Sequence, residues 1–261
     1  MISLKTYINK EDFEKGSKVL NHHFVEPLTK EGALEAGIWC IGSQATPWEM
    51  ARDFIYRLRK FSYPDDPNSH EKISRIEVTT DVSLVNRCSK EVGWRFAYSD
   101  RFREFIEYFG KLNYDKDWHY EVRDSDGDFR EEIVQEVKWM GRKTFSFWHI
   151  CLGGKKLLAL DVWIMKALKD LGVDVPDHFV TSIARNVGSQ KVRKTPGKTD
   201  YLRIEEEARR LFSKDGRFVR DGQVDMALVD GVLWWKGASR ETRDQTSLFD
   251  YEADIRMPYK K

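Results

Sequence analysis

The apolar residues between positions 34 and 58 recur at helical spacing, at 34, 38, 41, 45, 48, 51, 55 and 58. A stripe with this period predicts helix that is buried along one side. The stripe is interrupted at 46–49 by Thr-Pro-Trp-Glu, which combines a capping threonine, a proline at the first helical position and a glutamate at the third. That combination begins a new helix. The pattern therefore predicts two consecutive helices, with Gln44 at their junction.

Capping residues followed by apolar stripes predict helices for most of the remaining chain. Asp81 opens one that stops before Gly93, and Ser99 or Asp100 opens the next. Residues 73–79 are interpreted as a short strand. Further helices are predicted at 10–19, 129–140, 162–171 with Asp161 as the N-cap, 201–212 and 224–235. The pattern as a whole predicts an all-α protein with little or no strand.

The length and composition limit the classes of protein to consider. With 261 residues the chain can form one large domain or two lobes without disulfide support. A membrane-spanning helix needs about 20 consecutive apolar residues, and no stretch of the sequence approaches that length. The N-terminal residues are too mixed for a secretory signal, so we expect cytoplasmic residence and no membrane partner.

The cysteines and the net charge narrow the choice further. Cys40, Cys88 and Cys151 are far apart and odd in number, which argues against a disulfide framework and against a four-cysteine zinc or iron–sulfur site. We expect buried thiols and no metal or other cofactor. The net charge of +1 does not by itself indicate a nucleic-acid-binding protein, so such a surface requires local clusters of lysine and arginine.

The stretch from Val137 to Asp161 carries the clearest candidate chemistry. Lys143 begins an aromatic-rich segment that includes Phe145, Phe147 and Trp148, and Asp161 follows Lys143 by 18 residues. Apolar surroundings favour a neutral amine, which is the nucleophilic form of a lysine. An aspartate that caps a helix is held rigidly by backbone N–H groups. The pair is therefore a candidate nucleophile with a fixed carboxylate.

Four segments, taken in order, resemble the marker segments of the helix–hairpin–helix DNA glycosylases, the endonuclease III superfamily. They are Gly42-Ser-Gln-Ala-Thr46, Gly93-Trp-Arg-Phe96, Met140-Gly-Arg-Lys-Thr144 and Leu160-Asp-Val162. The resemblance covers roughly residues 34–170. It implies a two-lobed, all-α fold with the active-site cleft between the lobes. Residues 31–140 would form a central lobe with the wedge residue, and residues 1–30 plus 141–261 a second lobe with the catalytic lysine and aspartate.

The resemblance also implies roles for individual residues. In that family a glutamine or asparagine fills the space left by a flipped base, a lysine in a Gly-x-Lys-Thr turn attacks the sugar, and an aspartate further along assists. These roles fall on Gln44, Lys143 and Asp161. The chemistry agrees, because a base inside a duplex must be extruded, at a cost of a few kcal/mol, before an enzyme can reach it. A carboxylate such as Asp161 would stabilise the positive charge that develops on the sugar.

Two departures from the family pattern matter. Members carry a Leu-Pro-Gly-x-Gly hairpin, whereas this chain has Val137-Lys-Trp-Met-Gly141. Because tryptophan rarely adopts a positive φ, we expect Trp139 to avoid the left-handed region and the turn to be reshaped. The iron–sulfur cysteines of many members are absent. That absence indicates a cluster-free branch, among which are the 8-oxoguanine DNA glycosylases.

Several side chains are candidates for contacts with the substrate and the DNA backbone. Val232-Leu-Trp-Trp235 resembles the segment that supplies a stacking aromatic in 8-oxoguanine glycosylases, so Trp234 is a candidate for stacking on the base. Core packing explains Trp234 equally well. Phe147 and Trp148 are weaker candidates, and core packing is the favoured interpretation for each of them. The candidates for gripping the backbone are Arg95, Lys138, Gly141, Arg142, Lys191, Arg193 and Lys194, the last three in a basic segment at 188–200.

A last motif lies near the C-terminal end of the sequence. Residues Gln245 to Tyr251 resemble the short sequence by which repair proteins bind the sliding clamp, with Glu252 in place of a second ring. The motif indicates the sliding clamp as a partner in addition to DNA. The alternative is an ordinary polar segment.

The sequence thus predicts a monomeric, bifunctional DNA glycosylase/AP lyase that acts on double-stranded DNA, with 8-oxoguanine as the preferred base. One alternative is a glycosylase for oxidised pyrimidines or for a mismatched base. Another is a DNA-binding helix–hairpin–helix protein without catalysis. The corresponding localisation is cytoplasmic, in association with the nucleoid, or nuclear in a eukaryote.

Overall fold

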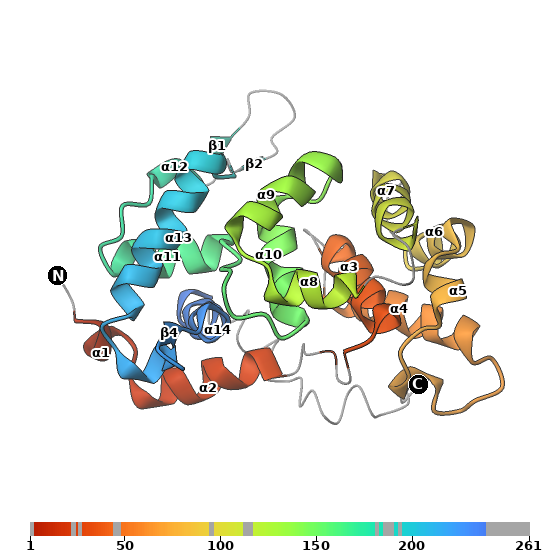
Figure 1. Cartoon of the computed structure of the whole chain (residues 1–261), viewed down its shortest axis with the longest axis horizontal. Coiled ribbons are helices and arrows are strands. Elements are labelled where there is room, and N and C mark those ends of the chain that lie inside the picture. The colour runs from red at the N-terminus through yellow and green to blue at the C-terminus, as the bar shows by residue number, and fades with distance from the viewer. Residues whose placement is uncertain are drawn as a thin grey trace. The chain divides into compact units, whose positions relative to one another are not determined.

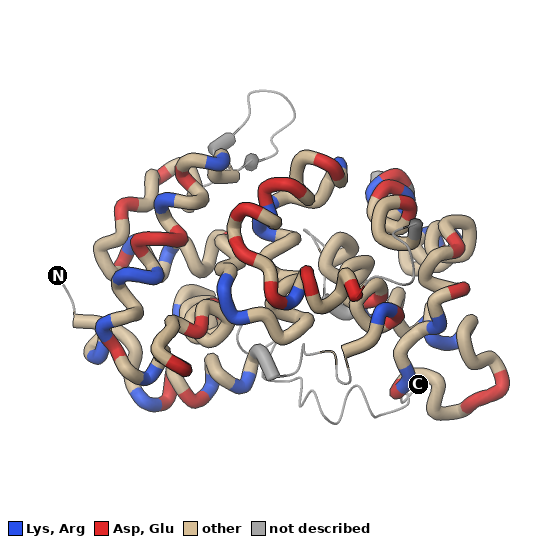
Figure 2. The backbone as a smooth tube through the Cα atoms, viewed as in Figure 1, with Lys and Arg blue, Asp and Glu red and all other residues tan. Residues whose placement is uncertain are grey.

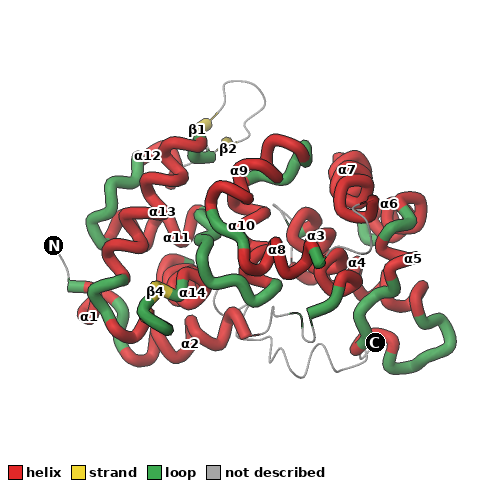
Figure 3. Tube along the Cα trace, viewed as in Figure 1, coloured by secondary structure: helices red, strands yellow, loops and turns green. Residues whose placement is uncertain are grey.

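The computed structural model describes residues 3–21, 25, 28–43, 48–93, 97–111, 117–180, 183–184, 191–192 and 195–238. These residues are almost entirely helical (Figure 1; Figure 3), as the hydrophobic pattern predicts. None of the helices in this part of the chain has the length and apolar character that crossing a bilayer requires. The described residues up to Asn21 and from Lys155 onward form one compact unit, the terminal unit, and those from Val25 to Gly154 form the central unit.

The terminal unit is built around α14, the last described helix. Its elements are α1 (Leu4–Tyr7), α2 (Lys10–Asn21), α11 (Val162–Asp170), α12 (Asp177–Val180), β1 (Ile183–Ala184), β2 (Lys191–Val192), α13 (Lys198–Phe212), the 3₁₀ helix η2 (Gly216–Phe218), β3 (Val219–Arg220), β4 (Gln223–Val224) and α14 (Met226–Gly237). Helices α2 and α11 pack against α14. A Cβ at Gly16 of α2 would lie only 2.5 Å from the Cα of Val232, so glycine is what allows α2 and α14 to approach so closely.

The strands of the terminal unit form two small antiparallel ribbons, β1 with β2 and β3 with β4. Asp221 and Gly222 make the turn between β3 and β4, and both have positive φ, as a two-residue hairpin of the primed type requires. Each described strand is only two residues long. The expectation of little strand is therefore confirmed.

The central unit is built around α3, which is buried on nearly every side. Its elements are α3 (Lys30–Gly42), α4 (Trp48–Ser62), the 3₁₀ helix η1 (Ser69–Glu71), α5 (Ile76–Thr79), α6 (Val82–Glu91), α7 (Ala97–Lys111), α8 (Trp118–Asp124), α9 (Gly127–Glu136) and α10 (Arg142–Cys151). Helices α7 and α10 pack against α3. Gly37 makes room for the ring of Phe105, since a Cβ at Gly37 would lie 2.1 Å from the ring.

Local signals in the sequence place several helix ends correctly. The first apolar stripe does divide into two helices, α3 and α4. The side chain of Asp81 accepts a hydrogen bond from the N–H of Leu84 and caps α6, and Asp161 caps α11. Gly93, with φ +81°, follows the end of α6. These predictions are confirmed because caps and stripes depend on residues only a few positions apart.

Three local predictions are wrong. The helix predicted at 129–140 ends at Glu136, and the other two concern residues 73–79 and the start of α7. The segment at 73–79 is no strand: Ile76–Thr79 form α5, and the N–H of Thr79 donates to the carbonyl of Arg75 at 3.0 Å. An isolated strand would leave its backbone groups without partners, whereas a helical turn satisfies them internally. The helix predicted to open at Ser99 or Asp100 begins earlier, at Ala97.

The division into compact units differs from the expected lobes of 31–140 and of 1–30 plus 141–261. Helix α10 packs against α3 and α9, with Phe145 and Trp148 fully buried. Lys143 therefore belongs to the central unit, and Asp161 belongs to the terminal unit. The apolar face of α10 accounts for the difference, because it joins the helix to the core that precedes it in the chain.

Candidate active site

Helices α9 and α10 are joined by a tight turn, from Val137 to Gly141. The N–H of Val137 donates to the carbonyl of Ile133 at 2.8 Å, and the N–H of Met140 donates to that of Val137 at 3.1 Å. Gly141 is the N-cap of α10 with extended backbone, and it contributes no side-chain cap. A Cβ placed on Gly141 would have no contacting heavy atom within 4 Å, so the backbone there is open to a ligand. A helix N-terminus with such an approach is a favourable place for a phosphate.

Trp139, in the middle of this turn, has a left-handed backbone. Its φ is +74° and its side chain is 46% exposed. The expectation that tryptophan would avoid this region is therefore wrong. The conformation costs a residue with a side chain about 1–2 kcal/mol. The Arg101 guanidinium lies 5.2 Å and the Lys138 ammonium 5.3 Å from the ring centroid, and such contacts contribute about 0.5–1 kcal/mol each at exposed sites. They offset much of the strain.

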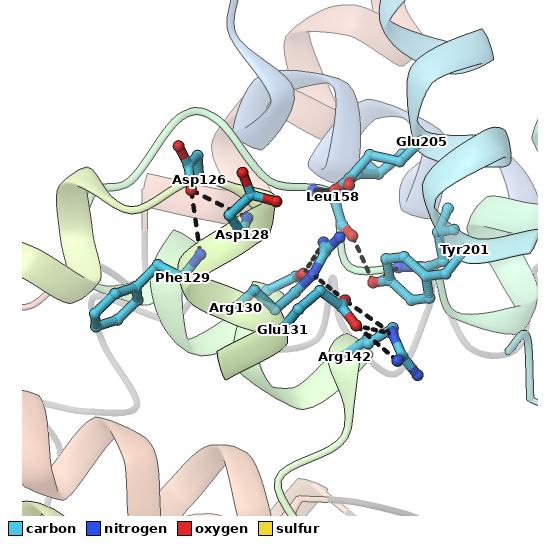
Figure 4. Close-up of polar contacts among 11 residues, drawn as sticks. Asp126, Asp128, Phe129, Arg130, Glu131, Arg142, Leu158, Tyr201 and Glu205 are labelled. Atoms are coloured by element: carbon cyan, nitrogen blue, oxygen red, sulfur yellow. Dashed lines mark hydrogen bonds and ion pairs between the residues drawn. The ribbon is translucent and has the colours of Figure 1, made fainter. Parts of the chain in front are cut away.

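Two polar links hold α9 against α10 (Figure 4). Glu131, only 5% exposed, accepts bonds from Nε and Nη2 of Arg142, the shortest at 2.7 Å. Arg130, completely buried, donates from Nη1 to the hydroxyl of Ser146 at 3.0 Å, and its Nε lies 3.5 Å from Glu131. A buried carboxylate between two guanidinium groups holds the hairpin in one arrangement. The structure thus pairs Arg142 with Glu131, and the phosphate contact suggested for Arg142 stays a prediction.

One side of α9 is acidic, and Figure 2 shows acidic positions recurring along this helix. Glu132 and Glu136 are exposed. Burial raises the pKa of the Tyr108 phenol on α7, and the charges of Glu136 and Glu132 raise it further. A polyanion is repelled from this side of the helix. Lys138 and Lys143 therefore mark the part of the hairpin that a phosphate backbone can approach.

Lys143 is the second residue of α10 and is half-buried. Its Nζ lies 5.2 Å from the centroid of the Phe147 ring, one helical turn further on. Phe147 in turn lies against Trp39 of α3, with 5.5 Å between the ring centroids. The amine is thus placed in the first turn of a helix, beside an aromatic wall, with part of its surface open to solvent.

Two of the aromatic candidates on α10 differ in their surroundings. Trp148 is completely buried, and its Nε1 donates to the carbonyl of Ala33 at 2.8 Å. Its ring packs edge-on against Phe105 and Phe109. Trp148 is therefore a core residue, as the sequence interpretation favoured, because its ring does not reach the surface. Phe147 is only half-buried and remains a candidate.

Asp161 begins α11 in the terminal unit. Its Oδ1 accepts bonds from the N–H groups of Trp163 at 2.8 Å and of Ile164 at 2.9 Å. The carboxylate is half-buried. Charge-assisted bonds at a helix N-terminus stabilise the ionised form and fix its direction. Asp161 is therefore a pre-oriented anion.

Trp234, the candidate stacking residue near the C-terminal end of α14, is partly buried against the core of the terminal unit. Its neighbours Val232 and Leu233 are completely buried. The partial exposure of Trp234 keeps it available as a base-stacking residue, and that role stays a prediction.

Several predicted site residues lie outside the described residues: Gln44, Arg95, Arg193, Lys194 and the clamp motif from Gln245 to Tyr251. Lys191 is described only through its backbone, in β2. The roles proposed for these residues stay predictions.

The cysteines are buried free thiols, as predicted. Cys40 of α3 and Cys151 of α10 approach each other, with 3.9 Å between the sulfur atoms. Burial raises the pKa of the Cys88 thiol to about 11, which keeps it protonated and unreactive. Among the described residues no group of three or more His, Cys, Asp and Glu side chains could hold a metal ion.

The sequence interpretation missed some residues that support the candidate groups. Glu131 and Arg142 face each other across the hairpin, and opposite charges on both sides of a predicted turn are a usable signal. Tyr201 and Glu205 stand one turn apart on the apolar face of α13 and are buried there. Their position on the apolar face of a predicted helix is the signal that could have identified them. Polar groups on such a face are buried, and buried polar groups have hydrogen-bond partners.

Comparison with known proteins bears on the fold. The structure is similar to the crystal structure of the Methanocaldococcus jannaschii 8-oxoguanine glycosylase/lyase in complex with a 15mer DNA containing 8-oxoguanine, with a TM-score of 0.50 and 17% sequence identity, over 87% of this chain and 89% of that chain. No family model and no curated protein sequence matches this chain. At this identity the likeness shows the fold, which is all-α in agreement with the sequence-based prediction.

Proposed function

We propose that this protein is a DNA glycosylase with AP lyase activity that removes a damaged base from double-stranded DNA. The observation that carries the proposal is the position of Lys143 in the first turn of α10, directly after the hairpin. The fold, similar to that of an 8-oxoguanine glycosylase/lyase, supports it. That similarity and the partial exposure of Trp234 make 8-oxoguanine the first base to test.

Lys143 would act as the nucleophile. Its neutral Nζ attacks C1′ of the deoxyribose, the glycosidic bond breaks, and the electron pair leaves with the base, which takes up a proton. The ring oxygen then leaves C1′ with the amine proton, and an imine links Nζ to C1′. Loss of a C2′ proton expels the 3′-phosphate and cuts the strand. Because only a neutral amine is nucleophilic, Nζ must give up its proton before the attack.

Asp161 would stabilise the positive charge that develops on the sugar as the base departs. An oriented carboxylate of this kind costs no reorganisation during the reaction. The helix-cap bonds to its Oδ1 fix its direction. The proposal assigns it to electrostatic stabilisation and leaves the nucleophilic step to Lys143.

The DNA backbone would be held by the α9–α10 hairpin, through the open N-terminus of α10 at Gly141 and the exposed cation of Lys138. The exposed ring of Trp139 lies in the same turn and would contact a sugar. Gln44 is proposed as the wedge that fills the space of the flipped base, and Trp234 as the stacking residue. Binding of this kind weakens steeply as salt rises, because phosphate contacts release counterions.

Borohydride trapping tests the proposal, because reduction of the imine leaves a covalent protein–DNA adduct. We expect wild-type protein to form an adduct with a duplex that contains a single abasic site, and Lys143→Gln to form none. Lys138→Gln is the matched control, since it removes a nearby lysine charge and should weaken binding without preventing adduct formation. Absence of an adduct with wild-type protein, or equal trapping by Lys143→Gln, contradicts the lyase assignment. Base release from duplexes with single lesions then identifies the substrate.

A further inference from the structure

The segment from Lys155 to Leu160, which leads directly into Asp161, is held by side chains from α13 and α14. Three consecutive N–H groups donate to buried side chains: Leu158 to Oε1 of Glu205 at 2.8 Å, Ala159 to Oδ2 of Asp230 at 2.8 Å, and Leu160 to the Tyr201 hydroxyl at 3.0 Å. The Tyr201 hydroxyl also donates to the carbonyl of Leu158 at 2.7 Å. Figure 4 shows Glu205 and Tyr201 directed at Leu158.

The start of the same segment is bonded in a similar way. The N–H of Met226 donates to the carbonyl of Lys155 at 2.8 Å, and Nη2 of Arg209 donates to that of Lys156 at 2.6 Å. The segment belongs to no helix or strand, yet its leucine side chains are buried. Its backbone is thus anchored at nearly every residue, although it has no regular secondary structure.

The choice of hydrogen-bond partners is unusual. Glu205 and Asp230 are each 5% exposed, and Tyr201 is 1% exposed. Removing a carboxylate from water is costly, and backbone N–H groups can be satisfied by neutral acceptors. Two carboxylates on neighbouring N–H groups form short charge-assisted bonds that resist displacement. The arrangement therefore fixes the backbone next to Asp161 more firmly than packing alone.

We propose that Tyr201, Glu205 and Asp230 are positioning residues for Asp161. They bind the backbone at 158–160 and thereby fix the position of the Asp161 carboxylate at the start of α11. This inference rests on the proposed function, because it assumes that Asp161 acts on the sugar. Electrostatic stabilisation depends on the placement of the charge to within a fraction of an ångström. Tyr201 matters most, since its hydroxyl bonds two backbone groups of the segment, Leu160 N and Leu158 O.

The test compares two reactions of the same protein. Base release requires the carboxylate at the sugar, whereas trapping on a duplex with a preformed abasic site requires only the amine. We expect Tyr201→Phe to slow single-turnover base release from an 8-oxoguanine duplex by about tenfold or more, while trapping on the abasic duplex and the duplex Kd stay within about twofold. Asp230→Asn keeps the side-chain shape, and it should also slow base release while trapping and duplex affinity stay unchanged. This variant provides the test if Tyr201→Phe does not fold.

Tyr7→Phe is the matched control. It removes a hydroxyl of the same unit that donates to Asp170 at 3.0 Å, a residue outside the 155–160 segment, and should leave both reactions unchanged. If the two positioning variants lose base release and trapping equally, or lose neither, the positioning role is wrong while the proposed function stands. If wild-type protein releases neither 8-oxoguanine nor any other base of a lesion panel, the proposed function fails, and this inference fails with it.

Discussion

Lys143 and Asp161, the two groups assigned to chemistry, are held in opposite ways. Lys143 follows a tight turn with a strained residue, and its amine is half-buried beside one ring. Asp161 follows a segment whose backbone is bonded to three buried side chains, and its own carboxylate is bonded to two N–H groups. The support of the first group stops at the helix backbone, whereas the support of the second extends to the carboxylate itself.

The difference matches the demands of the proposed reaction. A nucleophilic amine has to lose a proton, reach the sugar, form a bond and give it up again, so its side chain needs freedom. A charge that stabilises a transition state works best when it does not move. Rigid support is therefore found behind the carboxylate, while around the lysine it stops at the helix backbone through the Glu131–Arg142 pair.

The largest expected effect comes from removing the fixed charge. Asn caps helices as well as Asp does, so Asp161→Asn should keep the stability of α11 while it removes the carboxylate charge. We expect single-turnover base release to fall by about 10²- to 10³-fold, the usual loss for one preorganised electrostatic group, with the melting temperature nearly unchanged.

Asp225→Asn is the matched control for this change. Asp225 caps α14 through the N–H of Leu228 at 3.0 Å and has no proposed part in the reaction. It should leave base release as in wild type. Equal rates for Asp161→Asn and wild type would remove Asp161 from the mechanism.

A smaller effect is expected from the support of the lysine helix. Glu131→Gln leaves the buried Arg130 and the half-buried Arg142 without the intervening negative charge. Loss of one partner from a buried pair costs about 3–5 kcal/mol, and the 23% exposure of the Arg142 side chain lowers the expected loss to about 2 kcal/mol in denaturant unfolding.

The double variant Glu131→Gln with Arg142→Gln sharpens the result, because it removes one of the two charges left without a carboxylate, that of Arg142, and should recover part of the lost stability. Glu132→Gln, on the exposed acidic side of α9, should change stability by no more than about 0.5 kcal/mol. If Glu131→Gln is as stable as Glu132→Gln, the pair does not hold the hairpin together.

The smallest effect concerns the strained residue in the turn. Trp139→Ala and Trp139→Gly both remove the ring, and only glycine removes the left-handed strain. We expect the glycine variant to be more stable than the alanine variant by about 1 kcal/mol. Both should bind duplex DNA several-fold more weakly than wild type, to the same extent, in fluorescence anisotropy at fixed salt. Unchanged affinity in both variants would exclude the ring from the DNA interface.

The sequence predicted those features that depend on neighbouring residues. Apolar residues three or four positions apart predicted α3, α4, α11 and α14, and Asp81 and Asp161 were identified as caps because a cap bonds N–H groups two or three residues on. The order and spacing of Gly-Arg-Lys-Thr and Leu-Asp-Val led to a glycosylase-like, all-α fold, and the fold is confirmed.

Tertiary structure decided the features in which distant residues meet. It placed α10 and Lys143 in the central unit, directed Arg142 to Glu131, buried Trp148 and held Trp139 at positive φ. The bonds from Leu158 to Glu205 and from Ala159 to Asp230 join residues 47 and 71 positions apart. No local pattern encodes such pairs, because they form only when packing brings two helices to the same stretch of backbone. The residues proposed for the chemistry were thus chosen from the sequence, whereas the contacts that hold them in place came from the tertiary structure.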